Sequence, residues 1–338
     1  MATGRRDQIL PNVARREIRL RATLALAVAA LVIAASSCTG GSAPAVGPGP
    51  AGPVGTGATG IVGTGPTGTG GTGATGSQGN PITGKDFDPG NFDDPTTIDN
   101  PWFPLQPGTR SVLEGRALDG EEWIERRVVV TVTDLTKVIA GVRTLVTHEL
   151  DYNDGRLVES DLAFYAQDND GNVWQLGEYP EEYERGEIVK APAWIHGAEG
   201  ARAGLTMPIE SQLGMPSYAQ GWGPAVGWND RANTHEMGVT ACVPVDCYAD
   251  VLVIREFNRD EPGASQLKFY ASGVGGVRVG WMGPNEVERE RMVLVDLVLL
   301  SPEALADARS VVLEQDGRGY EIRGKVYGQT SPAEVLAS

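Results

Sequence analysis

A run of glycine, threonine and proline before Lys85 decides which part of this chain can fold. Within it, eight-residue units begin at Gly49, Gly57, Gly65 and Gly73. The run has no periodic apolar positions, so it cannot bury enough surface to offset the entropy of ordering. A dinucleotide-binding glycine loop needs a flanking strand and helix, and collagen needs an unbroken three-residue period; the repeat has neither. We therefore predict a disordered tether over residues 38–84, spanning roughly 35–40 Å, and a single folded domain over residues 85–338.

The first 37 residues have the three-part organisation of a signal peptide. Arginine-rich residues come first, and an uncharged run of 14 residues follows from Ala22 to Ala35. That run is shorter than the ~20 residues that a membrane-spanning helix needs.

The next residues, Ala35-Ser-Ser-Cys38, resemble the bacterial lipobox, although leucine is usual where Ala35 stands. The resemblance implies a lipoprotein: residues 1–37 are removed, and Cys38 is acylated and becomes the new amino terminus. Two or three acyl chains make a stable anchor. The alternative is an ordinary secretory signal that leaves a free thiol at Cys38. The Arg15-Arg16 pair leaves both the general and the twin-arginine export routes open.

The charge of the chain restricts its partners. The formal net charge is −16, and removing residues 1–37, with a local charge of +4, leaves about −20. Such a surface repels phosphate backbones, so we predict no nucleic-acid binding. It also repels anionic lipid headgroups, and contact with the membrane should therefore come from the anchor on the extracytoplasmic face.

The pattern beyond Lys85 is typical of an all-β fold. Short β-type runs alternate with turn signals about every ten residues. The predicted strands cover residues 126–134, 142–151, 157–167, 173–178, 251–257, 266–271 and 289–300. Asp-Gly turns are expected at residues 119–120, 154–155, 170–171 and 316–317. We predict one mainly antiparallel domain, a curled sheet, sandwich or open barrel, with one or two short helices near the C-terminus. The clearest helix runs from Ser301 to Arg309, with Ser301 as its N-cap.

The turn at Asp154-Gly155 predicts the register of its hairpin. A two-residue loop pairs positions whose numbers sum to 309, which places His148 opposite Asp161. A carboxylate opposite a histidine raises the histidine pKa and orients the ring, as a general base or a metal ligand requires. The pair is the candidate metal site, and a half-exposed structural pair is its alternative. We predict no other metal site, no cofactor and no identifiable catalytic residue.

Two cysteines remain after Cys38. Four residues separate Cys242 from Cys247, and the pair lies before a predicted strand. We predict a disulfide across a hairpin end, which fits an oxidising compartment. A metal clip or a redox pair is the alternative, but the spacing is not C-x-x-C and no further ligand completes a zinc site.

Several stretches resemble an uncharacterised family of secreted or lipid-anchored, β-rich bacterial proteins. Asn100–Thr109 is similar to its "NPxFPLxPGT" entry to the first strand, and Phe164–Trp174 to its "WYAQDxxGNVWYFGE" block, from which Gln175-Leu176 departs where aromatics are usual. The segments 200–208, 248–256 and 269–277 also resemble family motifs. The resemblance implies a β-rich extracytoplasmic fold and no particular activity.

These observations favour a tethered, non-catalytic binding or envelope-associated module. One alternative is an extracytoplasmic hydrolase that uses a carboxylate pair. Another is a lipid or small-ligand carrier, which a closed apolar cavity would favour.

Overall fold

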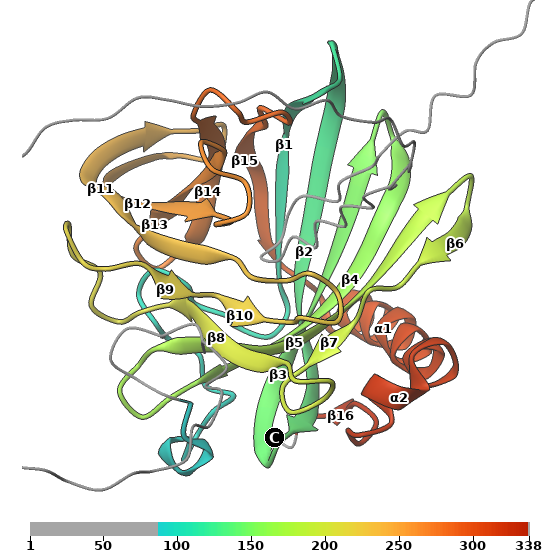
Figure 1. Cartoon of the computed structure of the whole chain (residues 1–338). Coiled ribbons are helices and arrows are strands. Elements are labelled where there is room, and N and C mark those ends of the chain that lie inside the picture. Colours follow the sequence, from blue (N-terminus) through green and yellow to red (C-terminus); the bar gives the residue numbers. More distant parts are fainter. Residues whose placement is uncertain (1–86, 337–338) are drawn as a thin grey trace, which may run out of the picture. The chain divides into compact units, whose positions relative to one another are not determined.

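The structure is a computed structural model of the chain and describes residues 87–336. Antiparallel strands dominate this part, and they form one sheet (Figure 1). The strands are β1 (Thr109–Asp119), β2 (Glu122–Ile139), β3 (Val142–Asn153), β4 (Arg156–Gln167), β5 (Val173–Glu184), β6 (Glu187–Lys190), β7 (Trp194–Ile195), β8 (Arg202–Met207), β9 (Tyr218–Ala219), β10 (Gly221–Trp222), β11 (Arg231–Cys242), β12 (Cys247–Phe257), β13 (Ser265–Ala271), β14 (Gly275–Met282), β15 (Arg291–Leu299) and β16 (Glu334–Val335). The helices are a 3-10 turn η1 (Pro89–Asn91), α1 (Pro302–Ile322) and α2 (Gly324–Tyr327).

The sheet curls into an almost closed barrel. Hydrogen-bonded neighbours follow the order β10-β8-β5-β4-β3-β2-β1-β15-β14-β13-β12-β11-β9, while β6 and β7 extend β5 and β16 pairs with β2. The first and last strands of this order, β10 and β9, are separated along the chain by Gln220 alone. At this seam, a Cβ on Gly204 of β8 would lie 2.2 Å from the backbone nitrogen of Gly221, so the close approach requires glycine. The prediction of an all-β, curled sheet is confirmed.

Alternation along the strands gives the sheet two buried faces at β2 to β5. Successive side chains point to opposite faces of a strand. One face points into the barrel, and α1 covers the other, outer face, packing against β2 (Figure 1). Val312 is the fully buried apolar residue of α1, and Phe164, Tyr179 and Tyr327 belong to the same apolar core.

The C-terminal helix begins as predicted but is longer than predicted. The Ser301 hydroxyl accepts a hydrogen bond from the backbone nitrogen of Ala304 at 3.2 Å, which confirms the N-cap. The helix continues to Ile322 because polar side chains of its second half form contacts with the sheet. Lys137 Nζ of β2 donates to Asp316 Oδ1 at 2.8 Å, and Arg318 pairs with Glu181 at 2.8 Å. The predicted turn at residues 316–317 is therefore wrong, since both residues lie inside α1.

The predicted turns at residues 154–155 and 170–171 are confirmed at the β3–β4 and β4–β5 connections. The β1–β2 turn is present one residue later than predicted, at residues 120–121, because Asp119 still belongs to β1 and pairs with Glu122. All seven predicted strands are present, and Val251–Ile254 lies within β12, a central strand. Within residues 87–336, the helices are too short or too polar to cross a membrane.

The predicted register of the β3–β4 hairpin is wrong beyond its first two pairs. Asn153 pairs with Arg156 and Tyr152 with Leu157, as expected, but Asp151 then pairs with Glu159. The register shifts there because β4 carries one extra residue, a β-bulge. A slip of one residue exchanges the faces of all side chains beyond it. His148 consequently pairs with Leu162, and Asp161 pairs with Glu149.

Candidate ligand-binding site

The barrel contains a cavity of about 120 Å³ that is partly open to solvent. Inward-facing residues of β1, β2, β14 and β15 make most of its wall. The apolar members are Leu113, Val128, Val130, Val132, Val279 and Leu297. An apolar cavity of similar size, ~150 Å³, is large enough to bind benzene in another protein. The volume thus fits a compact molecule of a few carbon atoms or the end of a longer chain.

A plug, residues 98–105, closes one side of the cavity with Phe103, Pro104 and Leu105. An isolated bridge joins Ile98 to Leu105 and makes the plug a closed loop. The Asn100 side chain holds this loop. Its Oδ1 accepts from the backbone nitrogens of residues 102 and 103 at 3.0 and 3.2 Å, and its Nδ2 donates to the carbonyl of residue 171 at 2.9 Å. Residues 103–105, which lie within the Asn100–Thr109 motif, therefore form part of the wall of the site.

Part of the cavity wall, which we call the polar end, is formed by polar residues of β3, β4 and β13. Glu149 of β3 is 6% exposed and Tyr165 of β4 is fully buried, and both line the cavity together with Lys268 and Tyr270 of β13. Glu149 Oε1 and the Tyr165 hydroxyl have no hydrogen-bond partner among the described residues. A buried polar atom left unpaired costs about 1–3 kcal/mol and is rare in native proteins. Of the buried side-chain atoms without a partner among the described residues, these two belong to residues that line the cavity, where a bound molecule would complete their hydrogen bonding.

Beyond Glu149 lies a cluster of buried carboxyls, which we call the acidic cluster. It consists of Glu149, Asp151, Glu159, Asp161, Glu178 and Glu290. The strand register explains the grouping, because Glu149 pairs with Asp161 and Asp151 with Glu159 on the inner face of the β3–β4 hairpin. Two cations face the cluster. Arg126 lies 2.6 Å from Asp151 Oδ2 and 2.5 Å from Glu290 Oε1, and Lys268 Nζ lies 2.9 Å from Glu256 Oε2.

Burial without enough cations raises the carboxyl pKa values. Burial, together with the neighbouring Asp151, raises the pKa of Asp161 to about 8. Burial raises the pKa of Glu290 to about 7 and that of Asp151 to about 6, although Arg126 opposes both shifts. Burial and the charges of Asp151 and Asp161 hold the pKa of Glu149 well above its usual range. Near neutral pH the cluster therefore keeps protons that exposed carboxyls would have lost.

The structure does not bring the candidate metal pair together. The His148 ring lies on the outer face, where Nε2 is 2.9 Å from Ser160 Oγ, and the Ser160 hydroxyl in turn donates to Gln315 Oε1 of α1 at 2.7 Å. Burial lowers the pKa of His148 to about 4, which keeps the ring neutral. Asp161 lies on the inner face. Among the described residues, no group of three or more His, Cys, Asp or Glu side chains is arranged to hold a metal ion.

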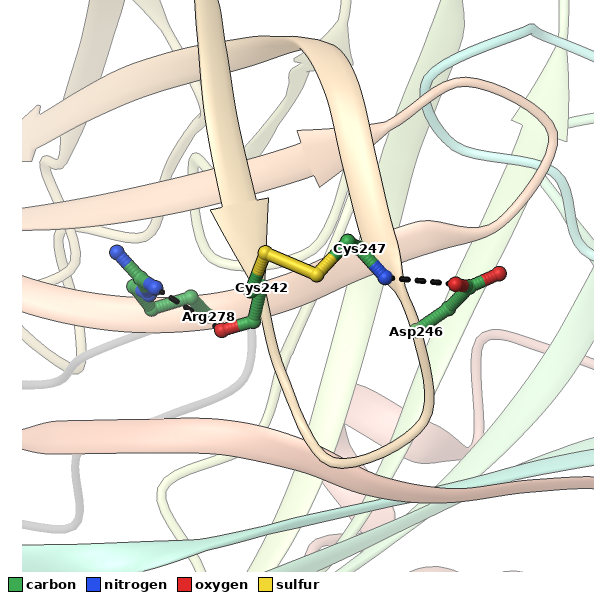
Figure 2. The surroundings of a disulfide bond; sticks show 4 residues. All are labelled: Cys242, Asp246, Cys247 and Arg278. Carbon is green, nitrogen blue, oxygen red and sulfur yellow. Dashed lines mark hydrogen bonds between the residues drawn. A yellow bond between two sulfur atoms is a disulfide. The ribbon is translucent and has the colours of Figure 1, made fainter.

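The predicted disulfide between Cys242 and Cys247 is present (Figure 2). It closes the end of the β11–β12 hairpin, and its two cysteines pair directly across the strands. Asp246 Oδ1 accepts from the backbone nitrogen of Cys247 at 2.7 Å, and Arg278 donates to the Cys242 carbonyl at 3.3 Å. These contacts give the disulfide a structural role at the hairpin end. Cys38 and the tether lie outside the described residues, so their roles stay predictions.

The sequence contained a signal for the acidic cluster that the predicted register obscured. Glu149 and Asp151, and likewise Glu159 and Asp161, are two residues apart, and residues at that spacing share a face of a strand. The predicted register, which lacked the bulge, placed Asp161 on the same face as His148. In the observed register, the bulge in β4 places all four carboxyls on one face.

Comparisons with known proteins add little to this site. No protein-family model and no curated protein matches the chain. A solved structure of a Bacteroides fragilis protein, described as exported and of YmcC-like fold, aligns with 58% of this chain and 98% of its own, at 11% identity and a TM-score of 0.35. A Parabacteroides distasonis protein described as a lipoprotein aligns with 60% of this chain and 99% of its own, at 12% identity and a TM-score of 0.32. At these TM-scores neither alignment carries an argument about the site.

Proposed function

We propose that this protein is a tethered extracytoplasmic binding module that takes a small ligand with an apolar body and a polar end into its barrel. The acyl chains on Cys38 would hold the domain at the membrane, and the tether would keep it away from the lipid surface. The observation that carries the proposal is the cavity of about 120 Å³, lined by apolar side chains and ending on two unpaired buried polar atoms. Small-molecule sites combine these features: mostly apolar walls and a few placed polar groups.

A carboxylate-pair hydrolase is less well supported by the same geometry. Its mechanism needs two carboxyl groups on opposite sides of the bond that is cleaved. Glu149 is the one carboxyl that lines the cavity, and the other members of the acidic cluster lie behind it. A binding role needs a single polar contact and is therefore favoured.

Filling the cavity tests the proposal. Val130 of β2 points into the cavity, and Val130→Phe should occupy it. Val129 lies on the opposite face of the same strand, so Val129→Phe is the matched control. Benzyl alcohol, a compact probe with a polar end, should raise the thermal unfolding temperature of the wild type and of Val129→Phe but not of Val130→Phe. The proposal is contradicted if benzyl alcohol does not stabilise the wild type, or if it stabilises Val129→Phe and Val130→Phe equally.

A further inference from the structure

We propose that the ligand is an amine whose ammonium group pairs with Glu149 at the polar end of the cavity. The inference rests on the proposed function and names the chemical class of the ligand. It starts from Glu149, whose Oε1 is buried, lines the cavity and has no hydrogen-bond partner among the described residues. The neighbouring Tyr165 hydroxyl is unpaired in the same way and offers a second contact.

The charges around Glu149 favour a cation over an anion. The groups that act electrostatically on Glu149 are Asp151 of its own strand, Asp161 and Glu159 of β4, and Lys268 of β13. Three are carboxyls. The one cation is already paired, since Lys268 Nζ lies 2.9 Å from Glu256 Oε2. Arg126 behind them pairs with Asp151 and Glu290.

The rim of the cavity carries one further positive charge, which is not among the main charges that act on Glu149. Arg278 borders it, but its guanidinium donates to the Cys242 carbonyl and lies 5.3 Å from the Phe269 ring centroid. An anionic ligand at Glu149 would add negative charge beside carboxyls that already keep their protons, whereas an ammonium group would compensate the carboxylate that Glu149 forms on binding. A buried charge is tolerated when it is paired and hydrogen-bonded.

Amine binding should be coupled to proton release. An ammonium group pairs with an ionised carboxylate, and burial with the neighbouring Asp151 and Asp161 keeps the Glu149 pKa well above its usual range. Below that pKa, binding must displace the proton of Glu149 into solvent. The affinity for an amine should therefore rise with pH, while that for a neutral molecule of equal size should not.

Three probes of equal size and different charge test the inference: benzylamine, benzyl alcohol and benzoate. The sample is the complete mature chain with Cys38→Ser, which avoids detergent, and the method is titration calorimetry at pH 6 in two buffers of different ionisation enthalpy. We expect benzylamine to bind at least tenfold more tightly than benzyl alcohol, with release of up to one proton, and benzoate to bind most weakly. The proton count uses a chain whose folded part is unchanged and so does not depend on the folding of a cavity variant.

Variants then assign the effect to one side chain. Glu149→Gln should abolish both the tenfold preference and the proton release. Glu114→Gln, an equivalent change at an exposed carboxyl of β1, should leave both unchanged. If benzyl alcohol binds as tightly as benzylamine, or benzoate binds best, the amine inference is wrong and the proposed binding function stands. If none of the three probes binds, both proposals are wrong.

Discussion

The buried carboxyl Asp161 should make the protein less stable as the pH rises. A carboxyl whose pKa is raised by folding contributes its full stability below the unfolded pKa and loses it as pH rises through the folded pKa. For Asp161 these limits are ~3.9 in the unfolded chain and about 8 in the folded domain. The acidic cluster should thus oppose folding between pH 4 and pH 8, in contrast to a carboxyl that is stabilised by a salt bridge.

The magnitude follows from the size of this shift. Each unit of pH between the two pKa values lowers the free energy of unfolding by about 1.4 kcal/mol. Ionisation of Asp161 therefore lowers the free energy of unfolding by up to about 4 kcal/mol between pH 5 and pH 8. The total stability of a domain is roughly 5–15 kcal/mol, so this loss is measurable. Asp161→Asn removes the titration while keeping the shape of the side chain. The free energy of unfolding of the variant, relative to wild type, should increase by roughly 2–4 kcal/mol from pH 5 to pH 8.

Equilibrium urea unfolding, followed by tryptophan fluorescence at several pH values, measures this difference. Asp119→Asn is the control, because Asp119 is exposed at the β1–β2 turn, and its offset from wild type should not change with pH. If the stability profiles of Asp161→Asn and wild type run parallel from pH 5 to pH 8, the electrostatic account of the cluster is refuted.

Three further predictions concern Arg126, Asn100 and Cys38. Arg126→Met leaves two buried carboxyls without their cation and should lower the free energy of unfolding by about 3–5 kcal/mol. Arg127→Met removes an exposed ion pair and should change the free energy of unfolding by less than ~1 kcal/mol. Urea unfolding of both variants measures the two changes. Asn100→Ala removes the hydrogen bonds that hold the plug and should accelerate hydrogen exchange across residues 98–105, so unchanged exchange there would contradict the assigned role. Cys38→Ser should release the protein into the medium or leave an uncleaved precursor, and normal processing with full membrane retention would exclude lipidation.

The strand pattern of the folded domain could be read from the sequence because its turns carry strong local signals. Asp154-Gly155 has positive φ at both residues and forms the β3–β4 turn, and Gly120 after Asp119 has positive φ in the β1–β2 turn. The Asp-Gly pair in α1 shows the limit of that signal. Arg309 and Arg318 on that helix reach Asp134 and Glu181 on the sheet, and such tertiary contacts override local preference.

The site itself could not be predicted because it depends on a bulge and on closure of the barrel. Glu149 and Lys268 lie on β3 and β13, which are far apart in sequence and in the strand order. They line one cavity because the sheet curls until its ends meet at β9 and β10. Local sequence determines alternation along a strand, but no local signal specifies which distant strand lies across the barrel.

An acidic interior that opposes folding calls for a physical reason. Replacing Asp161 or Glu149 by a neutral residue should stabilise the domain at neutral pH, and sites that carry such a cost are commonly functional. An amine bound at Glu149 would offset part of the cost by pairing with the carboxylate. A ligand that binds only the folded state stabilises it by an amount that grows with its affinity. Benzylamine should therefore raise the unfolding temperature more at pH 8 than at pH 5, which is opposite in sign to the effect of pH on the free protein. An equal rise in unfolding temperature at both pH values would show that benzylamine binding is not coupled to the ionisation of the acidic cluster.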